Sequence, residues 1–319
     1  MDRNLKTWFK SGSPWVWLNA GAVSISIIMV VGLLLLIAVR GLGHFWPAAL
    51  LEADYHGRDG QMTKVIGSIR DTEQVTAERL RSLGETLDTT APVVDRHLLK
   101  VGNRDVSGVD FRWLTDTNLL NRHYPAGLMV LERREWGDMY GYLQQVREQE
   151  QLVAEGPAAW LALQQRLARA SLLFDQIRDI EKHEIGAINY DMERLRLKQR
   201  GLELKGQFDE QQQASINARQ TELQQQYQQH QQQLQSLYEA YRQDSITVRL
   251  SDGQVVEIAM AMIVNAYRPN AMTTTDKIIF YMAKLWEFVS DEPREANTEG
   301  GIFPAIFGTV MMVILMTMN

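Results

Sequence analysis

The sequence contains no cysteine, so disulfide bonds, thiolate metal ligands and cysteine nucleophiles are all excluded. It also has no excess of positive charge, since the formal net charge is -6 and the isoelectric point is near 5.6. A nucleic-acid-binding protein carries a basic footprint, so we expect no nucleic-acid partner. The mean hydropathy of -0.25 is too low for a chain that lies mostly within a membrane.

Motifs for nucleotide binding and for catalysis are missing as well. The sequence has no G-x-x-x-x-G-K-[ST] loop, no G-x-G-x-x-G fingerprint and no G-x-S-x-G elbow. Its 6 histidines are scattered and form no H-E-x-x-H set. Asp179 and His183 lie one helical turn apart with Glu184 adjacent, and a solvated charged face explains this group better than a metal site. We therefore expect no catalytic residues, no cofactor and no metal.

What the sequence does contain is a long uncharged run near its start. No charged residue occurs between Ser11 and Val39, and residues 20–39 are almost entirely apolar. At about 1.5 Å per residue this core spans the roughly 30 Å hydrocarbon layer, so it predicts a transmembrane helix. A cleaved signal peptide is the alternative, but its apolar region runs for only about 7–15 residues. No small-x-small cleavage site follows Val39, because Arg40 interrupts the pattern.

The charges that flank this run predict its orientation. Arg3, Lys6 and Lys10 precede it, against the single acidic residue Asp2. By the positive-inside rule, residues 1–19 form a cytoplasmic N-terminus and an interfacial segment. Residues 40–299 then lie outside the cell membrane. In a Gram-negative bacterium this places the chain in the inner membrane, with its bulk in the periplasm.

Residues 40–299 predict a domain of mixed α and β structure. Between residues 61 and 140, runs such as VDFRWL and GLMVLERREW are separated by turn signals such as HYPAG. We interpret these runs as strands of a small sheet, with one helix in TAERLRSLGETL. A later pair of alternating runs, joined by Ser251, Asp252 and Gly253, predicts a β-hairpin at about 246–260.

The stretch between these strands has a helical pattern. Apolar residues recur in steps of three and four at Trp160, Leu163, Leu167, Ala170, Phe174 and Ile177, and again from Ile216 to Tyr241. Fifteen of the 37 residues in 207–243 are glutamine, a composition that also occurs in disordered segments. The regular seam favours an inserted antiparallel coiled-coil hairpin over about 157–243, bent at QRGLELKG and roughly 60 Å long. Pairing between two chains is the alternative, and His230 on the seam is interpreted as a polar residue that sets register.

Two further segments follow the hairpin. The sequence TTTDKIIFYMAKLWEFVSD predicts an amphipathic helix at about 275–290, which either packs on the external domain or lies at the membrane surface. Residues 300–319 carry no charge and predict the start of a second transmembrane helix. The predicted fold class is therefore membrane-anchored α+β: one transmembrane helix, an external domain with an inserted coiled coil, and the start of another transmembrane helix.

The last segment resembles a known family. In permease subunits of the phosphate-specific ABC transporter, of the PstA type, a Gly-Gly-Ile-x-Pro-x-x-x-Gly-Thr stretch opens the second transmembrane helix. This motif, which we call the Gly-Gly-Ile motif, stands here at Gly300, Gly301, Ile302, Pro304, Gly308 and Thr309. The N-terminal helix also agrees with the family, and some proteobacterial members carry a long external insertion between these two helices. Proline in a first helical turn costs no hydrogen bond, and small residues allow membrane helices to pack closely.

The resemblance implies a function and a set of partners. It implies the N-terminal part of the permease subunit of an ATP-driven phosphate importer, with ATP hydrolysis in a partner subunit. The implied partners are a second permease subunit, cytoplasmic ATPase subunits and a periplasmic phosphate-binding protein. Since family permeases continue through further helices, we expect the chain to be truncated within its second transmembrane helix. The external domain is then a candidate docking surface for the binding protein or another envelope partner. The alternative is a stand-alone envelope scaffold or adaptor with two membrane helices and a periplasmic coiled coil.

Overall fold

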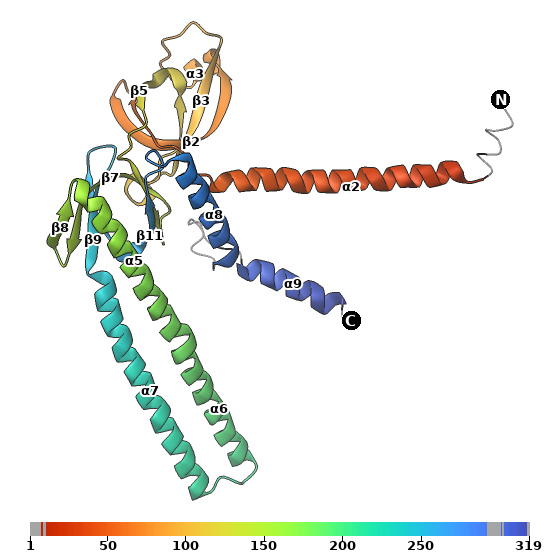
Figure 1. Cartoon of the computed structure of the whole chain (residues 1–319), viewed down its shortest axis with the longest axis vertical. Coiled ribbons are helices and arrows are strands. Elements are labelled where there is room, and N and C mark those ends of the chain that lie inside the picture. Colours follow the sequence, from red (N-terminus) through yellow and green to blue (C-terminus); the bar gives the residue numbers. More distant parts are fainter. Residues whose placement is uncertain (1–7, 9–10, 292–300, 302, 318–319) are drawn as a thin grey trace. The chain divides into compact units, whose positions relative to one another are not determined.

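The computed structural model describes residues 8, 11–291, 301 and 303–317 (Figure 1). The chain divides into two compact units, and each is described by itself. One unit comprises Ala48–Met272, and the other comprises the described residues of 1–47, 273–291 and 301–317. The predicted α+β class is confirmed, with antiparallel sheets and one long apolar helix near the N-terminus.

The strands of the first unit form two sheets, whereas the sequence predicted one small sheet. The first sheet has the order β4-β3-β2-β1-β5, and all its pairs are antiparallel. Its strands are β1 (Leu51–His56), β2 (Met62–Thr76), β3 (Val93–Lys100), β4 (Phe111–Thr115) and β5 (Leu119–His123). Two short helices, α3 (Ala77–Ser82) and α4 (Arg104–Ser107), connect these strands. Its core is built from Leu51, Ala53, Tyr55, Val65, Leu99, Leu114 and Leu119, all of which are buried.

The second sheet has the order β10-β9-β7-β6-β11, and β8 pairs with β7 beside this path. Its strands are β6 (Met129–Arg133), β7 (Met139–Glu148), β8 (Gln151–Glu155), β9 (Asp244–Arg249), β10 (Val255–Ala259) and β11 (Ile263–Tyr267). The strands β9 and β10 pair through the turn at 251–253, where the sequence predicted a hairpin. The helices α5, α6 and α7 leave this sheet after β8 and return at β9, which pairs with β7. They are therefore an insertion between β8 and β9, two strands that both pair with β7.

Two glycines allow a strand to change its pairing partner. The strand β2 pairs with β1 as far as Gly67 and with β3 from Ser68 onward. In the same way, β7 pairs with β6 as far as Gly141 and with β9 from Tyr142 onward. A Cβ atom at either glycine would lie 2.6 Å from a carbonyl oxygen of the neighbouring strand. Only glycine permits this approach, so both bends depend on the missing side chain.

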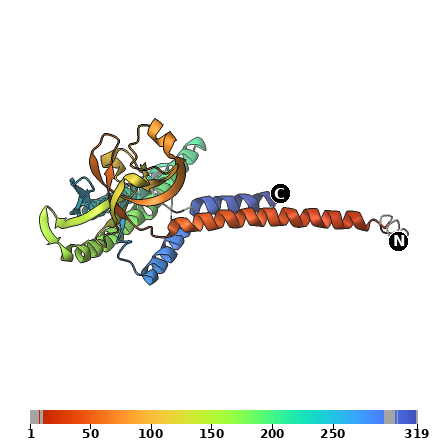
Figure 2. The same cartoon turned by 90° about the horizontal axis from the view of Figure 1, so that it is seen from above.

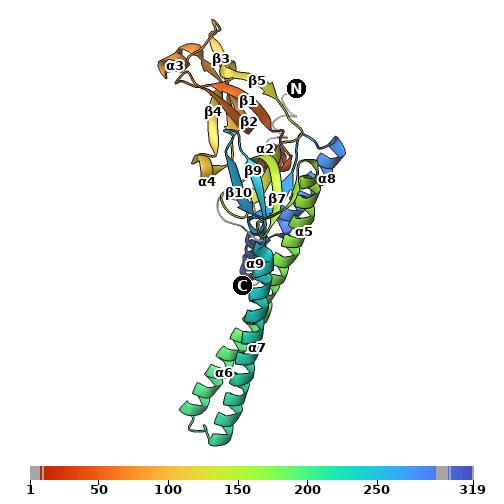
Figure 3. The same ribbon diagram turned by 90° about the vertical axis from the view of Figure 1, so that its left-hand side faces the viewer.

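The inserted helices form two arms that project from the second sheet (Figure 3). One arm consists of α5 (Pro157–Asp179), a π-helical turn η3 (Ile180–Glu184) and α6 (Ile185–Leu204), and the other is α7 (Glu210–Arg242). The ring centroids of Phe174 and Tyr241 lie 6.1 Å apart, and Arg219 pairs with Asp191 at 3.3 Å. Since residues further along α6 meet residues earlier in α7, the two arms run in opposite directions.

The turn between the arms lies slightly later than the predicted bend at QRGLELKG. The helix α6 continues through Gly201, because a glycine inside a helix costs only about 1 kcal/mol relative to alanine. It ends where Gly206 adopts a φ of 65° and donates to the carbonyl of Glu203, while the next amide donates to Leu202. These two bonds form a Schellman motif, which satisfies the last carbonyls of the helix. The following helix α7 is capped by Asp209, whose carboxylate accepts from the amide of Gln212 at 2.8 Å.

The π-helical turn keeps the apolar residues of the first arm facing α7. The buried residues Ile180 and Ile188 are eight positions apart, which exceeds two α-helical turns of about 3.6 residues each. A π turn accommodates one additional residue, because its hydrogen bonds run from i to i+5. The extra residue in η3 therefore brings Ile188 back to the buried side of the arm.

Within the described residues, the second unit contains three α-helices with defined bounds. They are α2 (Ser13–Leu42), α8 (Thr274–Ser290) and α9 (Phe303–Thr317). Among the described residues, the helical stretch Pro14–Phe45 is the one segment long and apolar enough to cross a membrane. The most apolar part of this stretch contains no buried residue. It contains the predicted core at 20–39 and extends beyond both ends. The apolar helix α9 is shorter, and the predicted flanking charges Asp2, Arg3, Lys6 and Lys10 lie outside the described residues.

Candidate functional site

The Gly-Gly-Ile motif lies at the start of α9. Gly300 and Ile302 lie outside the described residues, and Gly301 precedes the helix. Pro304 lies in its first turn, where a proline breaks no intrahelical bond. The Thr309 hydroxyl donates to the carbonyls of Ala305 at 2.9 Å and Ile306 at 2.8 Å, so the helix itself satisfies this polar group. A Cβ at Gly308 would meet no atom within 4 Å, which leaves a smooth, open helix face for another helix to contact.

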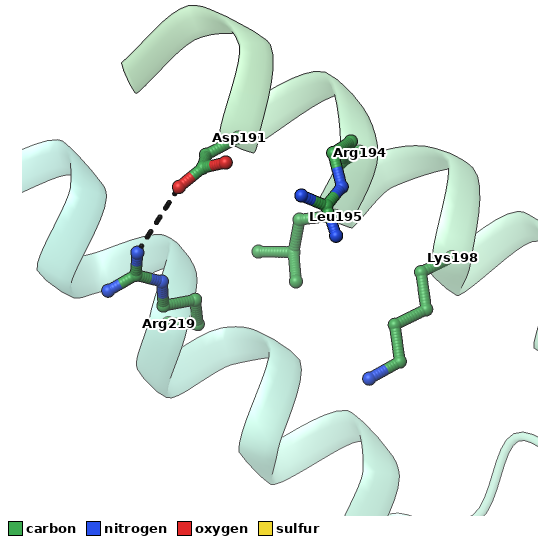
Figure 4. A pocket seen from close by; sticks show the side chains of 5 residues that line it. All are labelled: Asp191, Arg194, Leu195, Lys198 and Arg219. Carbon is green, nitrogen blue, oxygen red and sulfur yellow. Dashed lines mark hydrogen bonds and ion pairs between the residues drawn. The ribbon is translucent and has the colours of Figure 1, made fainter. Parts of the chain in front are cut away.

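A second candidate lies between the distal parts of the arms, and we call it the arm groove (Figure 4). It is an open depression of about 460 Å³, lined by Asp191, Arg194, Leu195 and Lys198 of α6 and by Arg219 of α7. Arg219 pairs with Asp191 at 3.3 Å and with Glu222 at 2.7 Å, and its hydrogen bond to Glu222 is the main cause that raises its pKa. Three cations against one lining carboxylate make this groove suited to anionic groups.

Sequence reasoning missed the arm groove, although a weak signal for it was present. Arg194 and Lys198 are four residues apart, which places them on one face of a helix. The facing arm carries Arg219 in a stretch otherwise dominated by uncharged glutamine. Nothing in the sequence shows which residues of the two arms face each other, so the three cations could not be grouped in advance.

A cluster of ion pairs holds the base of the arms to the sheet. Arg166 of α5 pairs with Glu148 of β7 at 2.8 Å and also with Asp244 of β9. Arg169 lies 3.6 Å from Glu148 and 3.7 Å from Asp244, whose side chain is buried. The hydrogen bond from Arg166, together with its charge, lowers the pKa of the Glu148 carboxyl. The cluster joins the paired strands β7 and β9 to α5, the first helix of the insertion.

Another buried ion pair links the short helix α4, which follows β3, to the second sheet. The guanidinium of Arg133, which is 4% exposed, donates to both oxygens of Asp105, at 2.7 and 3.0 Å. It also donates to the carbonyl of Gly137 at 3.0 Å. Burial alone would raise the pKa of Asp105, but the hydrogen bond and charge of Arg133 outweigh it and lower that pKa. The guanidinium, the carboxylate and the carbonyl therefore all have partners inside the fold, which is the arrangement of a structural ion pair.

Two tyrosine hydroxyls near the junction of the two sheets have raised pKa values. Burial raises the pKa of Tyr140, whose hydroxyl lies 3.4 Å from the carboxylate of Asp138. Burial and a hydrogen bond to Glu52 raise the pKa of Tyr142. Lys100 neutralises Asp138 at a distance of 2.6 Å. Both hydroxyls therefore stay protonated and serve as hydrogen-bond donors within the fold.

The two histidines considered in the sequence lie on the arms. His183 lies 2.8 Å from Asp179 on an exposed face of the first arm. His230 lies on α7, partly buried, and its Nδ1 atom has no hydrogen-bond partner. Within the part of the chain that the structure describes, no group of three His, Cys, Asp or Glu side chains could hold a metal ion.

The Gly-Gly-Ile motif and the arm groove thus supply two surfaces suited to binding, one apolar and one cationic. The apolar surface is the helix α9 with Pro304, Gly308 and Thr309, and the cationic surface is the arm groove. Comparison of the chain with family models, with curated proteins and with solved structures finds no match.

Proposed function

We propose that this chain belongs to the permease subunit of an ATP-driven phosphate importer in the bacterial inner membrane. The observation that carries the proposal is the Gly-Gly-Ile motif, whose described residues open an apolar helix with the polar atom of Thr309 satisfied internally. The order of the elements, in which the folded α+β unit lies between the apolar helices α2 and α9 in sequence, is consistent with it. In this proposal α2 and α9 belong to membrane helices, and residues 40–299 lie in the periplasm.

The proposal assigns transport, and no reaction, to this chain. A second permease subunit completes the pathway, cytoplasmic ATPase subunits hydrolyse ATP, and a periplasmic phosphate-binding protein delivers phosphate. In this proposal the two arms form an antiparallel coiled coil that extends the docking surface of the external domain. Its cationic arm groove favours an acidic surface on the binding protein, because like charges would repel and opposite charges guide encounter.

The proposal is tested by measuring phosphate uptake in cells whose protein carries a larger side chain at Gly308 of α9. We expect Gly308→Leu to lower uptake of radioactive phosphate by about tenfold, which corresponds to about 1.4 kcal/mol of lost helix packing. The matched control is Val310→Leu, because Val310 lies on the other side of the same helix. Sulfate uptake should be unchanged in both variants. If Gly308→Leu cells that contain normal amounts of the protein take up phosphate at the normal rate, the permease assignment is wrong.

The absence of cysteine makes the membrane orientation directly testable. We expect Ser236→Cys, on the exposed surface of α7, to react with a membrane-impermeant maleimide in cells with a permeabilised outer membrane. Ser11→Cys, just before α2, should react only after the inner membrane is opened. The opposite pattern would contradict the proposed orientation. Loss of residue 11 from the mature protein, seen by mass spectrometry, would show instead that α2 is a cleaved signal sequence.

The alternative function, an envelope scaffold with a coiled-coil domain, predicts a different result. Deletion of residues 157–243 would then abolish its function, while phosphate uptake would not respond to any change in α9. The two assays separate these functions without knowledge of the partner.

A further inference from the structure

The helix α8 is well formed but contains no buried residue. Its start is set by a capping box: the amide of Asp276 donates to the Thr273 hydroxyl at 3.2 Å, and the amide of Thr273 donates to the Asp276 carboxylate at 3.0 Å. Such a cap stabilises a helix independently of tertiary packing. The helical form of α8 is therefore encoded locally, and the described residues bury none of its side chains fully.

The exposed apolar residues of α8 lie together on one side. They are Ile278, Ile279, Met282, Trp286 and Val289, and the side chain of Trp286 is 72% exposed. At 3.6 residues per turn, these five residues fall within an arc of about 100°. The four charged residues of the helix, Asp276, Lys277, Lys284 and Glu287, fall on the remaining surface, where Lys284 pairs with Glu287 at 2.6 Å. A contiguous apolar face of this kind marks a surface that is covered in the functional state.

Aromatic contacts fix α8 to the end of the apolar helix α2. After α2 the chain passes through a short 3₁₀ turn, Gly43–Phe45, and reaches Trp46. The ring of Phe45 lies 4.9 Å from that of Phe288, and the ring of Trp46 lies 6.1 Å from that of Tyr281. Phe45 and Trp46 are adjacent residues just after α2, whereas their partners Tyr281 and Phe288 lie about two helical turns apart on α8. Thus α8 runs across the end of α2 and does not continue it (Figure 1, Figure 2).

We propose that α8 lies in the membrane interface, with its five apolar residues inserted into the outer leaflet where α2 ends. The inference rests on the proposed function in one respect, namely that α2 crosses the membrane. A helix held across the end of a transmembrane helix lies at the depth of the lipid headgroups, and an amphipathic helix is stable there with its apolar face in the acyl chains. Phe45, Trp46, Tyr281 and Trp286 then supply the aromatic residues that favour this depth.

The charges of α8 identify the kind of lipid surface. Two basic and two acidic residues lie between Thr274 and Ser290, so the helix has no net charge. Insertion is therefore driven by apolar burial and requires no anionic lipid, in contrast to polybasic membrane-binding segments. A zwitterionic phosphatidylcholine bilayer is sufficient.

The test uses the full chain, reconstituted into phosphatidylcholine nanodiscs, with one spin-labelled cysteine at a time. Labels at Met282→Cys and Trp286→Cys should collide with dissolved oxygen several-fold more often than with a water-soluble nickel complex, because oxygen concentrates in lipid. Labels at the next residues, Ala283→Cys and Glu287→Cys, should show the reverse preference, since they lie about 100° further round the helix. A label at Leu34→Cys, within α2, reports whether α2 itself lies in the bilayer.

Each outcome of this experiment decides the inference. Exclusion of both reagents at Met282→Cys and Trp286→Cys would show that protein covers the face, and free access of both would show that it lies in water. Either result, with the Leu34→Cys label in lipid, overturns the interfacial placement of α8 alone. A Leu34→Cys label accessible to the nickel complex overturns this inference together with the proposed membrane topology.

Discussion

Replacement of Arg133 by methionine is expected to lower the free energy of unfolding by about 3 kcal/mol, because it leaves the Asp105 carboxylate and a carbonyl without their buried donor. Arg196→Met is the matched control. Arg196 also holds a carboxylate with two hydrogen bonds, both 2.9 Å long and made to Glu193. Its side chain is 74% exposed, however, so water replaces the lost partner and we expect no measurable change. Pulse proteolysis in urea of the detergent-solubilised chain measures both values.

The effect of Arg133→Met should also depend on pH. Arg133 lowers the pKa of Asp105 in the folded protein, so the pair stabilises the fold fully above the ordinary aspartate pKa of about 3.9. This contribution is lost as the pH falls through the lowered pKa. The difference in unfolding free energy between wild type and variant should therefore narrow below about pH 4. A difference that stays constant into stronger acid would show that packing, and not the ion pair, is responsible.

Truncation of Leu163 to alanine should destabilise the attachment of the arms by about 3–5 kcal/mol. Leu163 lies on α5, is 0% exposed and belongs to the core cluster that includes Val146 and Ile246 of the second sheet. The substitution removes the transfer free energy of the side chain and leaves a cavity between helix and sheet. Leu161→Ala, two residues earlier on the same helix, is the control.

The control position differs from Leu163 in exposure and in little else. Leu161 is 65% exposed, so its truncation should change stability by no more than about 0.5 kcal/mol. Hydrogen exchange of amides in β7 and β9 reports the attachment directly, since these strands lie beneath α5. Equal effects of the two substitutions would contradict the packing of α5 on the second sheet.

Local patterns in the sequence predicted several elements of the fold. The uncharged run before Arg40 predicted α2, and alternating residues on either side of Gly253 lie in β9 and β10. Steps of three and four from Trp160 to Ile177 lie along α5. Each of these signals depends on neighbours within one turn or one strand, which is the range over which periodicity is informative.

Features that depend on distant residues could not be predicted. Arg133 and Asp105 are 28 positions apart, and any other acidic residue of the chain could have been its partner. The division of the strands into two sheets follows from pairings such as β7 with β9, which the inserted arms separate in sequence. Of the candidate site, the sequence identified the Gly-Gly-Ile motif by resemblance, whereas the arm groove required knowledge of which residues on α6 face α7.

At the level of the gene, the π-helical turn makes the first arm tolerant to the loss of a single codon. An in-frame deletion of one residue within 181–184 would remove the extra residue and convert this turn to an ordinary α-helix, so the later residues of the arm would keep their orientation relative to α5. Ile188 would then follow Ile180 by seven positions, about two α-helical turns, and would still face α7, so the pair between Asp191 and Arg219 could still form. Outside this turn, changes in length that the arm tolerates should come in steps of about three, four or seven residues, which preserve the register of a helical seam.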